Sequence, residues 1–563
     1  MEQARLIIAI ALSVLIFLVW DHFFMPKTPP PPTGAVARTE AQGGDAKAPS
    51  PAEAPVKPPE MTQAPATAAQ TAPAAAGATT PVAEAPARLF TVLTPLYEAE
   101  LTTRGAAVTR VVLTKYKETS AKDSPDMELV LLPAGEGTLA TAFSNGAAGS
   151  LATDNWNADS ASDVVDARTA SKSVTFTYDS PTGVLLEKTY TFTPDSYLVG
   201  VSVKAENGSG VPVPDRLYLG LKGHLGKPSK VVFQGPLVLV DGRVEQVQEK
   251  KIQKDPSVKG TIGWAGLTSR YFLSAIAPAQ GSPGEVLLSQ GGDGLLECRY
   301  VFPGDPIPPA GTRTWSAEVF FGPKSTSALA AAGHGLDRAL DFGWFDILAK
   351  PLLWLMNFMH SYIPNYGLAI IFLTILVKLA FWPLSTKSYK SMASMKKIAP
   401  LMQELREKYK HDKPKMNEEI FALYRTFKVN PMSGCLPMVV QIPVFIALYK
   451  MLYESIELRH SPFVGWITDL SVPDRLFHFG FSIPFMEPPF GIPVLTIIMG
   501  ASMFIQQKMT PAPGDPAQAK MMMLLPIVFT FIFINFPSGL VLYWLVNNII
   551  SMAQQYYIQR KYA

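Results

Sequence analysis

The sequence lacks most of what marks a redox, metal-dependent or hydrolytic enzyme. Its 563 residues include two cysteines, Cys298 and Cys435, and no CxxC pair, which argues against a disulfide framework or a thiol redox centre. It contains no nucleotide-binding loop, metal-ligand spacing, paired carboxylates or hydrolytic triad. We therefore predict no catalytic residue, no cofactor and no metal, and we do not expect an enzyme.

Charged residues are scarce and unevenly placed. They make up 17% of the chain against 48% hydrophobic residues, a balance that favours a membrane protein. Residues 351–563 carry 19 Lys+Arg against 11 Asp+Glu, or +8, so the net charge of +3 leaves 3 − 8 = −5 for residues 1–350. An acidic part beside a basic part predicts that the two lie in different compartments.

The first part of the chain divides by composition into three regions. Residues 1–25 hold an apolar run that follows Arg5 and has no small-residue cleavage site after it, which predicts an uncleaved signal-anchor transmembrane helix. Residues 26–87 are rich in Pro and Ala and predict a disordered linker. From 88 to 325, short alternating runs such as SVTFTYD and YLVGVSVKA, separated by Gly, Pro, Asn and Asp, predict an all-β sandwich.

The second part, residues 351–560, predicts a membrane core. Its apolar segments predict five transmembrane helices, at 362–383, 435–453, 492–509, 521–536 and 539–557. With the signal anchor at 1–25, the prediction is six transmembrane helices in all. Just before this core, residues 333–350 predict an amphipathic helix, which either lies on the membrane surface or packs on the sandwich.

Charge orients this predicted membrane core. Residues 384–431 carry 11 Lys+Arg against 5 Asp+Glu, which places them in the cytoplasm and the sandwich in the periplasm. Their apolar spacing predicts an antiparallel helical hairpin. Arg560 and Lys561 place the C-terminus in the cytoplasm with the N-terminus.

Polar residues within the predicted spans are the candidate site. Lys378 lies inside the first apolar segment after the sandwich, where a lysine at mid-depth costs roughly 2.5–3.5 kcal/mol. Its ammonium either snorkels to the headgroups or faces a hydrated groove, which it would share with Thr374 one helical turn earlier. Gln441 and Asn547, with Tyr543 one turn before Asn547, either join helices by hydrogen bonds or help to line the same cavity.

Several segments in this order resemble the YidC/Oxa family of membrane protein insertases, in its Gram-negative form. The matching segments are NYGLAIIFLTILVKLAFWPLS, VNPMSGCLPMVVQIPVFIALYKML, ELRHSPFVGWITDLS and INFPSGLVLYWLVNN. The resemblance implies a conserved core of five helices around a hydrophilic groove that opens to the cytoplasm and to lipid and is closed towards the periplasm.

The resemblance also assigns residues to that groove. Lys378 matches the family's intramembrane positive charge, which is usually an arginine, and Thr374 matches a position that meets the substrate. Gln441 matches a polar groove residue, and Tyr543 with Trp544 matches a tyrosine pair. The predicted substrate groove is therefore Lys378, Thr374, Gln441, Tyr543, Trp544 and Asn547.

The implied function is the insertion and folding of nascent inner-membrane proteins, alone or with the Sec translocon and its accessory subunits. Other expected partners are the phospholipid bilayer and, weakly, the ribosome through the hairpin, because the chain ends without a long basic tail. No specific nucleic acid sequence is expected. Two alternatives are a small-solute transporter or channel, which predicts an inverted repeat that we do not find, and a membrane-anchored periplasmic β-sandwich binding protein.

Overall fold

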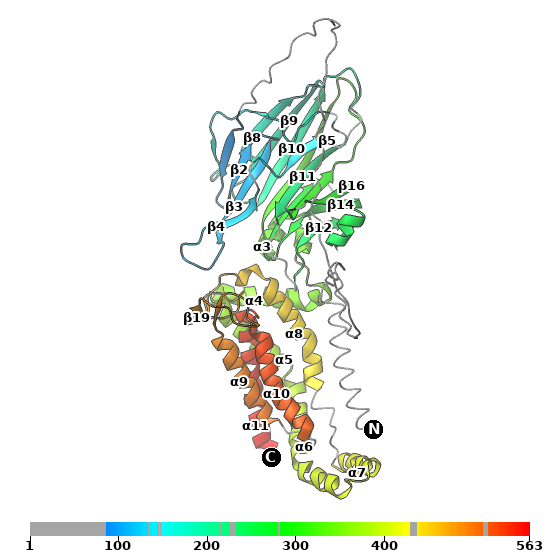
Figure 1. The fold of residues 1–563 in the computed structure, drawn as a ribbon, viewed down its shortest axis with the longest axis vertical. Coiled ribbons are helices and arrows are strands. Elements are labelled where there is room, and N and C mark those ends of the chain that lie inside the picture. Colours follow the sequence, from blue (N-terminus) through cyan, green and yellow to red (C-terminus); the bar gives the residue numbers. More distant parts are fainter. Residues whose placement is uncertain are drawn as a thin grey trace, which may run out of the picture. The chain divides into compact units, whose positions relative to one another are not determined.

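A computed structural model describes residues 86–563, apart from short gaps at 133–134, 144–145, 147, 214–215, 225–231, 280–281, 292, 428, 430–435, 511–515 and 563. The predicted signal anchor (1–25) and all but the last two residues of the predicted linker (26–87) lie outside the described residues, as does Cys435. Residues Ala87–Ala563 form one compact unit, in which a β-sandwich precedes a helical half (Figure 1).

The sandwich contains two sheets, which confirms the predicted β-sandwich. The smaller sheet has the order β4 (Asp126–Leu131), β3 (Ala107–Lys117), β2 (Tyr97–Thr102), β1 (Leu89–Leu93) and β7 (Val164–Asp166). The larger sheet has the order β5 (Ala140–Phe143), β11 (Leu217–His224), β17 (Leu295–Val301), β16 (Ser282–Gln290), β14 (Ser257–Thr268), β15 (Phe272–Pro278), β18 (Thr312–Pro323), β10 (Leu198–Asn207), β9 (Val184–Phe192), β8 (Lys172–Asp179) and β6 (Asn157–Ala158). The hairpin of β12 (Gly235–Val240) and β13 (Arg243–Gln246) branches from β14 and leads into the short helix α2 (Glu249–Lys254).

Strand β9 shows how the period-2 pattern builds the core. Its alternate residues Val184, Leu186, Tyr190 and Phe192 are buried, because successive side chains of a strand point to opposite faces. The same alternation buries Lys188 completely, and its ammonium donates to the backbone carbonyl of Leu139. A buried lysine without a carboxylate is costly, so this side chain is the least expected member of the sandwich core.

The prediction of one continuous helix over 333–350 is wrong. The chain forms α3 (Thr326–Ala332), two short 3-10 turns (Leu336–Ala339 and Gly343–Phe345), and then α4 (Asp346–Tyr362). Gly333, Gly335 and Gly343 have positive φ values of 69°, 71° and 65°, which continuous helix does not allow.

The two ends of this segment have different surroundings. Leu336 and Leu340 are buried in a cluster that includes Trp264 of β14, whose indole donates to the Gly335 carbonyl at 3.2 Å. Trp344 and Ile347 are 99% and 83% exposed. The beginning of the segment thus packs on the sandwich, whereas its end does not.

In the described residues the helical half consists of α4 and seven further helices, which are labelled in the lower part of Figure 1. After α4 they are α5 (Tyr366–Ala380), α6 (Trp382–Lys408), α7 (Lys413–Thr426), α8 (Leu436–Glu454), α9 (Val494–Met509), α10 (Pro516–Phe533) and α11 (Ser538–Tyr562). A 3-10 turn (Ile456–Leu458) follows α8, and the two-stranded β19 (Leu476–Phe479) and β20 (Phe490–Ile492) precede α9. Helix α11 contacts α5, α6, α8 and α9.

Within the described residues, no helix taken singly has both the length and the apolarity of a membrane span. Helices α5 and α6 meet that standard only together, with a bend of 66° between them, and Lys520–Phe533 of α10 is a shorter apolar helix.

Helices α6 and α7 pair through a small apolar cluster of their own. Ile398 and Met402 of α6 are buried against Met416 and Ile420 of α7, and Asp412 caps α7 by accepting from the Lys415 amide at 3.1 Å. The apolar spacing noted in the sequence therefore corresponds to the contact between these two helices.

Candidate functional site: a polar row along α11

Helix α11 carries Asn547, Ser551 and Gln554 at i, i+4 and i+7, so these three side chains lie on one face. The Gln441 amide of α8 donates to Asn547 Oδ1 at 2.8 Å. The Ser551 hydroxyl donates to the Asn547 carbonyl at 2.6 Å, and Gln554 donates to Thr386 Oγ1 of α6 at 3.2 Å. The face is thus a continuous polar row that joins α8, α11 and α6.

Lys378 enters this row from α5. Its Nζ donates to Ser551 Oγ at 2.7 Å, and the residue is only 7% exposed. The ammonium is therefore directed towards α11 inside the helical half. In the described part of the chain no carboxylate forms an ion pair with it, so a buried cation here meets only neutral oxygen.

The other predicted groove residues lie differently. Thr374 is 1% exposed, and its hydroxyl donates to the Ile370 carbonyl of its own helix at 2.7 Å. Tyr543 is 2% exposed and lies near Gln441. Trp544 packs in an aromatic cluster. The distance between ring centroids is 4.7 Å from Trp544 to Phe445 of α8 and 5.0 Å from Trp544 to Phe533 of α10. The hydrogen-bonded row therefore includes Lys378, Gln441 and Asn547, while Thr374 and Trp544 make other contacts.

Sequence reasoning missed part of the row. Ser551 and Gln554, which are each 2% exposed, were not predicted. Asn548, a polar residue of the same predicted span as Asn547, does not bond within the row and donates to Ser502 Oγ of α9 at 3.0 Å. The signal was present in the spacing, because polar residues recur on one face of α11 beyond the end of the matched INFPSGLVLYWLVNN segment.

The row combines one buried ammonium with amide and hydroxyl groups. A buried ammonium without a carboxylate is poised to attract negative charge, and the amides and hydroxyls beside it can hydrogen-bond polar backbone or side chains. Among the described residues, no group of three or more His, Cys, Asp or Glu is placed to hold a metal ion.

Two family models together cover the described unit. Residues 89–355 match the YidC periplasmic domain and residues 358–563 match the 60Kd inner membrane protein. These matches define the class: an inner-membrane protein with a periplasmic β-sandwich.

Full-length relatives give the family. The chain is 39% identical to "Membrane protein insertase YidC" of Syntrophus aciditrophicus (strain SB), over 99% of each chain, and 41% identical to the protein of that name from Pelobacter propionicus, again over 99% of each. A crystal structure described as an active YidC insertase is 19% identical over 84% of this chain and 95% of that one, with a TM-score of 0.36. The chain belongs to the YidC family of membrane protein insertases.

Proposed function

We propose that the protein inserts nascent inner-membrane proteins into the lipid bilayer and assists their folding, through a hydrophilic groove built around Lys378. The groove would lie among five of six transmembrane helices and open to the cytoplasm and to lipid. The observation that supports this most directly is the Lys378 ammonium, buried between α5 and α11 and hydrogen-bonded to a neutral hydroxyl.

The proposed mechanism needs no nucleotide hydrolysis. The α6–α7 hairpin receives a nascent hydrophobic segment in the cytoplasm. The polar row then shortens the distance that the polar flank of this segment must travel through the apolar interior of the bilayer. Lys378 holds acidic side chains of the flank transiently. Transfer of the segment into lipid, at about 25 cal/mol per Å² of apolar area, drives its release. Moving one negative charge along the membrane potential contributes about 2.3 kcal/mol per 100 mV.

The lysine changes how an acidic flank is recognised. An arginine would bind a carboxylate with two parallel hydrogen bonds, whereas the Lys378 ammonium acts as a point charge with rotatable donors. Part of its donor capacity is taken by Ser551. We therefore propose charge attraction without fixed geometry, which suits substrates with unrelated sequences.

The proposed partners follow from this role. They are nascent membrane proteins, the Sec translocon with its accessory subunits, the phospholipid bilayer and, weakly, the ribosome through the hairpin. Both chain ends would be cytoplasmic, and the protein would not act as an enzyme.

Site-specific photo-crosslinking tests the proposal. A photoreactive residue is placed at Thr374 or Tyr543, which are buried in the helical half, and stalled nascent chains of a small membrane protein are supplied. The matched control is Phe372, which is 42% exposed on the same helix as Thr374. Adducts at the first two positions and not at Phe372 support the groove. Their absence, with the protein present and folded, contradicts it and favours a membrane-anchored binding protein.

A further inference from the structure

Residues 463–475, which connect α8 to β19, are tied to the ends of four helices; we call them the closure loop. The Asn365 side chain at the start of α5 donates to the Phe463 carbonyl at 3.1 Å. Asp474 accepts from the Leu495 amide at the start of α9 at 2.7 Å, and Arg475 donates to the Ile534 carbonyl just beyond α10 at 2.9 Å.

Helix α11 begins on the same loop. The Ser538 hydroxyl donates to the Asp469 carbonyl at 2.8 Å, and the Gly539 amide donates to the Leu470 carbonyl at 2.9 Å. Connecting segments usually run over the surface, yet Asp469, Leu470 and Ser471 are all at most 5% exposed. The closure loop therefore covers the ends of α5, α9, α10 and α11.

The covered ends lie away from Lys378. Helix α5 begins at Tyr366, 12 residues (378 − 366) before Lys378, which is about 18 Å of helix. In the proposed topology this is the periplasmic end of the groove. The closure loop is thus placed where a barrier between groove and periplasm is needed.

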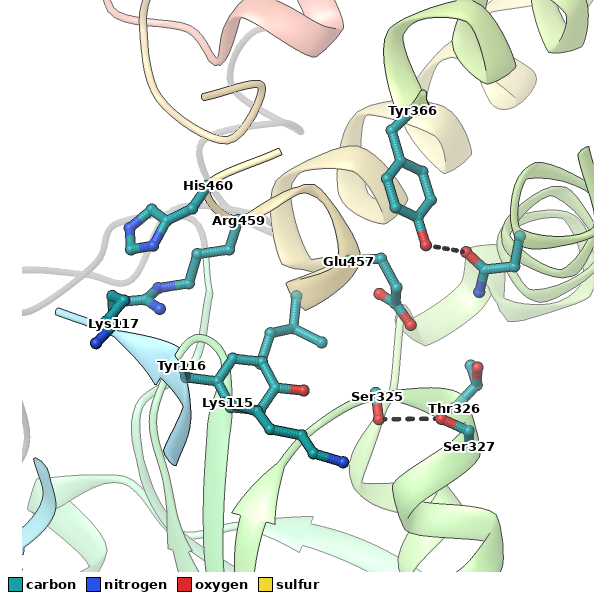
Figure 2. A pocket seen from close by; sticks show the side chains of 12 residues that line it. Lys115, Tyr116, Lys117, Ser325, Thr326, Ser327, Tyr366, Glu457, Arg459 and His460 are labelled. Atoms are coloured by element: carbon teal, nitrogen blue, oxygen red, sulfur yellow. Dashed lines mark hydrogen bonds between the residues drawn. The ribbon is translucent and has the colours of Figure 1, made fainter. Parts of the chain in front are cut away.

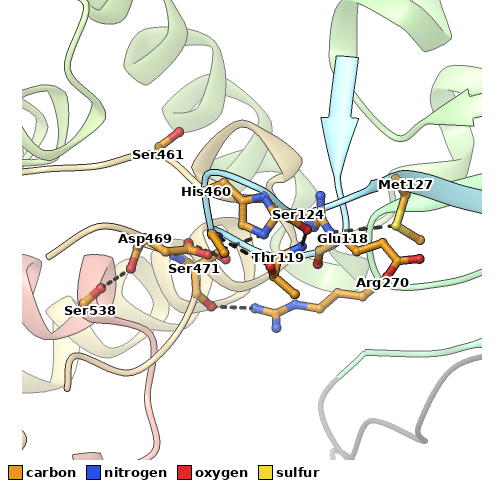
Figure 3. A network of polar contacts seen from close by, with 12 residues as sticks. Glu118, Thr119, Ser124, Met127, Arg270, His460, Ser461, Asp469, Ser471 and Ser538 are labelled. Atoms are coloured by element: carbon orange, nitrogen blue, oxygen red, sulfur yellow. Dashed lines mark hydrogen bonds and ion pairs between the residues drawn. The ribbon is translucent and has the colours of Figure 1, made fainter. Parts of the chain in front are cut away.

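The sandwich residue Arg270 contacts this loop. Arg270, in the turn between β14 and β15, donates through Nη2 to the Ser471 carbonyl at 3.3 Å (Figure 3). Its Nε donates to the Tyr453 carbonyl at 2.9 Å. Its guanidinium carbon lies 3.8 Å from the centre of the Tyr453 ring. Three contacts thus fix one guanidinium between the end of α8 and the closure loop.

Beside Arg270 the seam between sandwich and helices is polar and incompletely filled. A cavity of about 640 Å³ is lined by Tyr116 and Ser325 from the sandwich side and by Tyr366 and Glu457 from the helical side (Figure 2). Burial raises the pKa of the Glu457 carboxyl. Arg459, at the edge of the cavity, donates to the Glu118 carbonyl at 3.0 Å. Arg459 therefore also joins the helical half to the sandwich on this side.

We propose that Arg270 is a positioning residue through which the periplasmic sandwich holds the closure loop and keeps the groove shut towards the periplasm. This rests on the groove of the proposed function and gives the sandwich a mechanical part in it. A planar guanidinium can stack on Tyr453 and donate to two carbonyls at once, whereas a lysine ammonium cannot do all three.

The test measures access to the covered helix ends from the periplasm. Leu540, in the first turn of α11, is 1% exposed and serves as the probe in a Leu540→Cys variant that also carries Cys298→Ala and Cys435→Ser. An impermeant maleimide is added to spheroplasts that make the full chain. Arg270→Ala removes the charge-assisted hydrogen bonds that hold the closure loop, so the loop should open more often. The rate of maleimide labelling at position 540 should then increase by about tenfold. Arg270→Lys should give an intermediate rate, and Arg243→Ala, at an exposed arginine of β13, should give no change.

A second reporter separates positioning from unfolding of the sandwich. Cys298 is buried in β17, so Arg270→Ala is also made in a chain that keeps Cys298 and carries only Cys435→Ser. Faster labelling at position 540 with unchanged labelling of Cys298 supports the proposal. Faster labelling at both positions, or at neither, overturns it. Because the labelling is read on the protein itself and not on a substrate, the result can be judged separately from the crosslinks at Thr374 and Tyr543.

Discussion

The Lys378 ammonium lies 2.7 Å from the Ser551 hydroxyl, which itself donates to the carbonyl of Asn547 one turn earlier on α11. The positive charge is thus held at one point of a helix–helix contact by a neutral group. Among the described residues no carboxylate compensates this charge, which in the proposed function attracts the acidic flank of a substrate.

Substitution of Lys378 should act according to the charge of the substrate. Lys378→Glu should reduce translocation of an acidic N-terminal flank by about tenfold or more, because like charges now meet in a poorly solvated site. Lys378→Arg should retain it, and Lys378→Met should lie between the two. Protease protection of the translocated flank measures the effect.

The matched control is the same substrate with its flank aspartates replaced by asparagine. Lys378→Glu should then cost little, since the remaining flank carries no charge to repel. An equal loss for both flanks would contradict a role for charge at this position.

The Gln441–Asn547 hydrogen bond should show energetic coupling. In a double-mutant cycle with alanine at both positions, we expect a coupling of about 0.6 kcal/mol, the usual size for such bonds within membranes. Thermal unfolding of the protein in detergent provides the free energies. Gln441→Ala combined with Asn548→Ala should be additive, because Asn548 bonds to Ser502 instead.

The strands were predictable because their signal is local. Alternation in runs such as YLVGVSVKA is read directly from the sequence, and the same residues form β10 with alternating burial. The α6–α7 contact follows from spacing in the same way. Lys188 is a case in which two local signals disagree, because its place in an alternating run predicts burial but its charge predicts exposure. In the structure its side chain is buried, as the alternation predicts.

The site was less predictable because it depends on which helices meet. Lys378, Gln441 and Asn547 are conspicuous as polar residues in apolar runs, and the structure links them in one row. Ser551 is inconspicuous in a polar helix end, and only the packing of α11 on α5 gives it a role. The prediction of one helix over 333–350 was wrong for another reason. The spacing of apolar residues carries no information about the positive φ values of Gly335 and Gly343, which interrupt the helix.

Gly500 should be required for the contact between α9 and α10. A Cβ at this position would lie 2.1 Å from Thr530 Oγ1 and 3.1 Å from Thr530 Cγ2, and a β-branched side chain has little freedom to rotate away. Gly500→Ala should therefore destabilise the protein by about 1–3 kcal/mol. Thermal unfolding in detergent measures this.

A compensating change sharpens that prediction. Thr530→Ala removes Oγ1 and Cγ2, leaving only the Thr530 Cβ at 3.1 Å, and should restore part of the stability of the Gly500→Ala protein. Gly480→Ala, where a Cβ meets no atom within 4 Å, should stay within about 0.5 kcal/mol of the parent. Equal losses at Gly500 and Gly480 would show that close packing is not the cause.

The stability of the sandwich should depend on pH through Lys188. Burial lowers the pKa of Lys188 well below its ordinary value of 10.5, because the charged form is desolvated in the core. Between these two pKa values the unfolded chain binds more protons than the folded one, so the free energy of unfolding rises with pH. Relative to Lys188→Met, the native sandwich should therefore gain stability as the pH rises towards 9.5. The opening equilibrium constant should fall by a factor of up to about ten per pH unit.

Maleimide labelling of Cys298 in a Cys435→Ser chain reports this opening, because the thiol is buried in the core and becomes accessible only when the sandwich opens. The labelling rate of the parent divided by that of Lys188→Met cancels the pH dependence of the reagent and of the other titrating groups. This ratio should fall as pH rises if Lys188 is charged when the sandwich opens and neutral when it closes. With Lys250→Met, at an exposed lysine of α2, the corresponding ratio should stay flat. A flat ratio for Lys188→Met as well would mean that Lys188 stays protonated in the folded core, held by the Leu139 carbonyl and the Tyr190 ring, whose centre lies 5.2 Å from its Nζ.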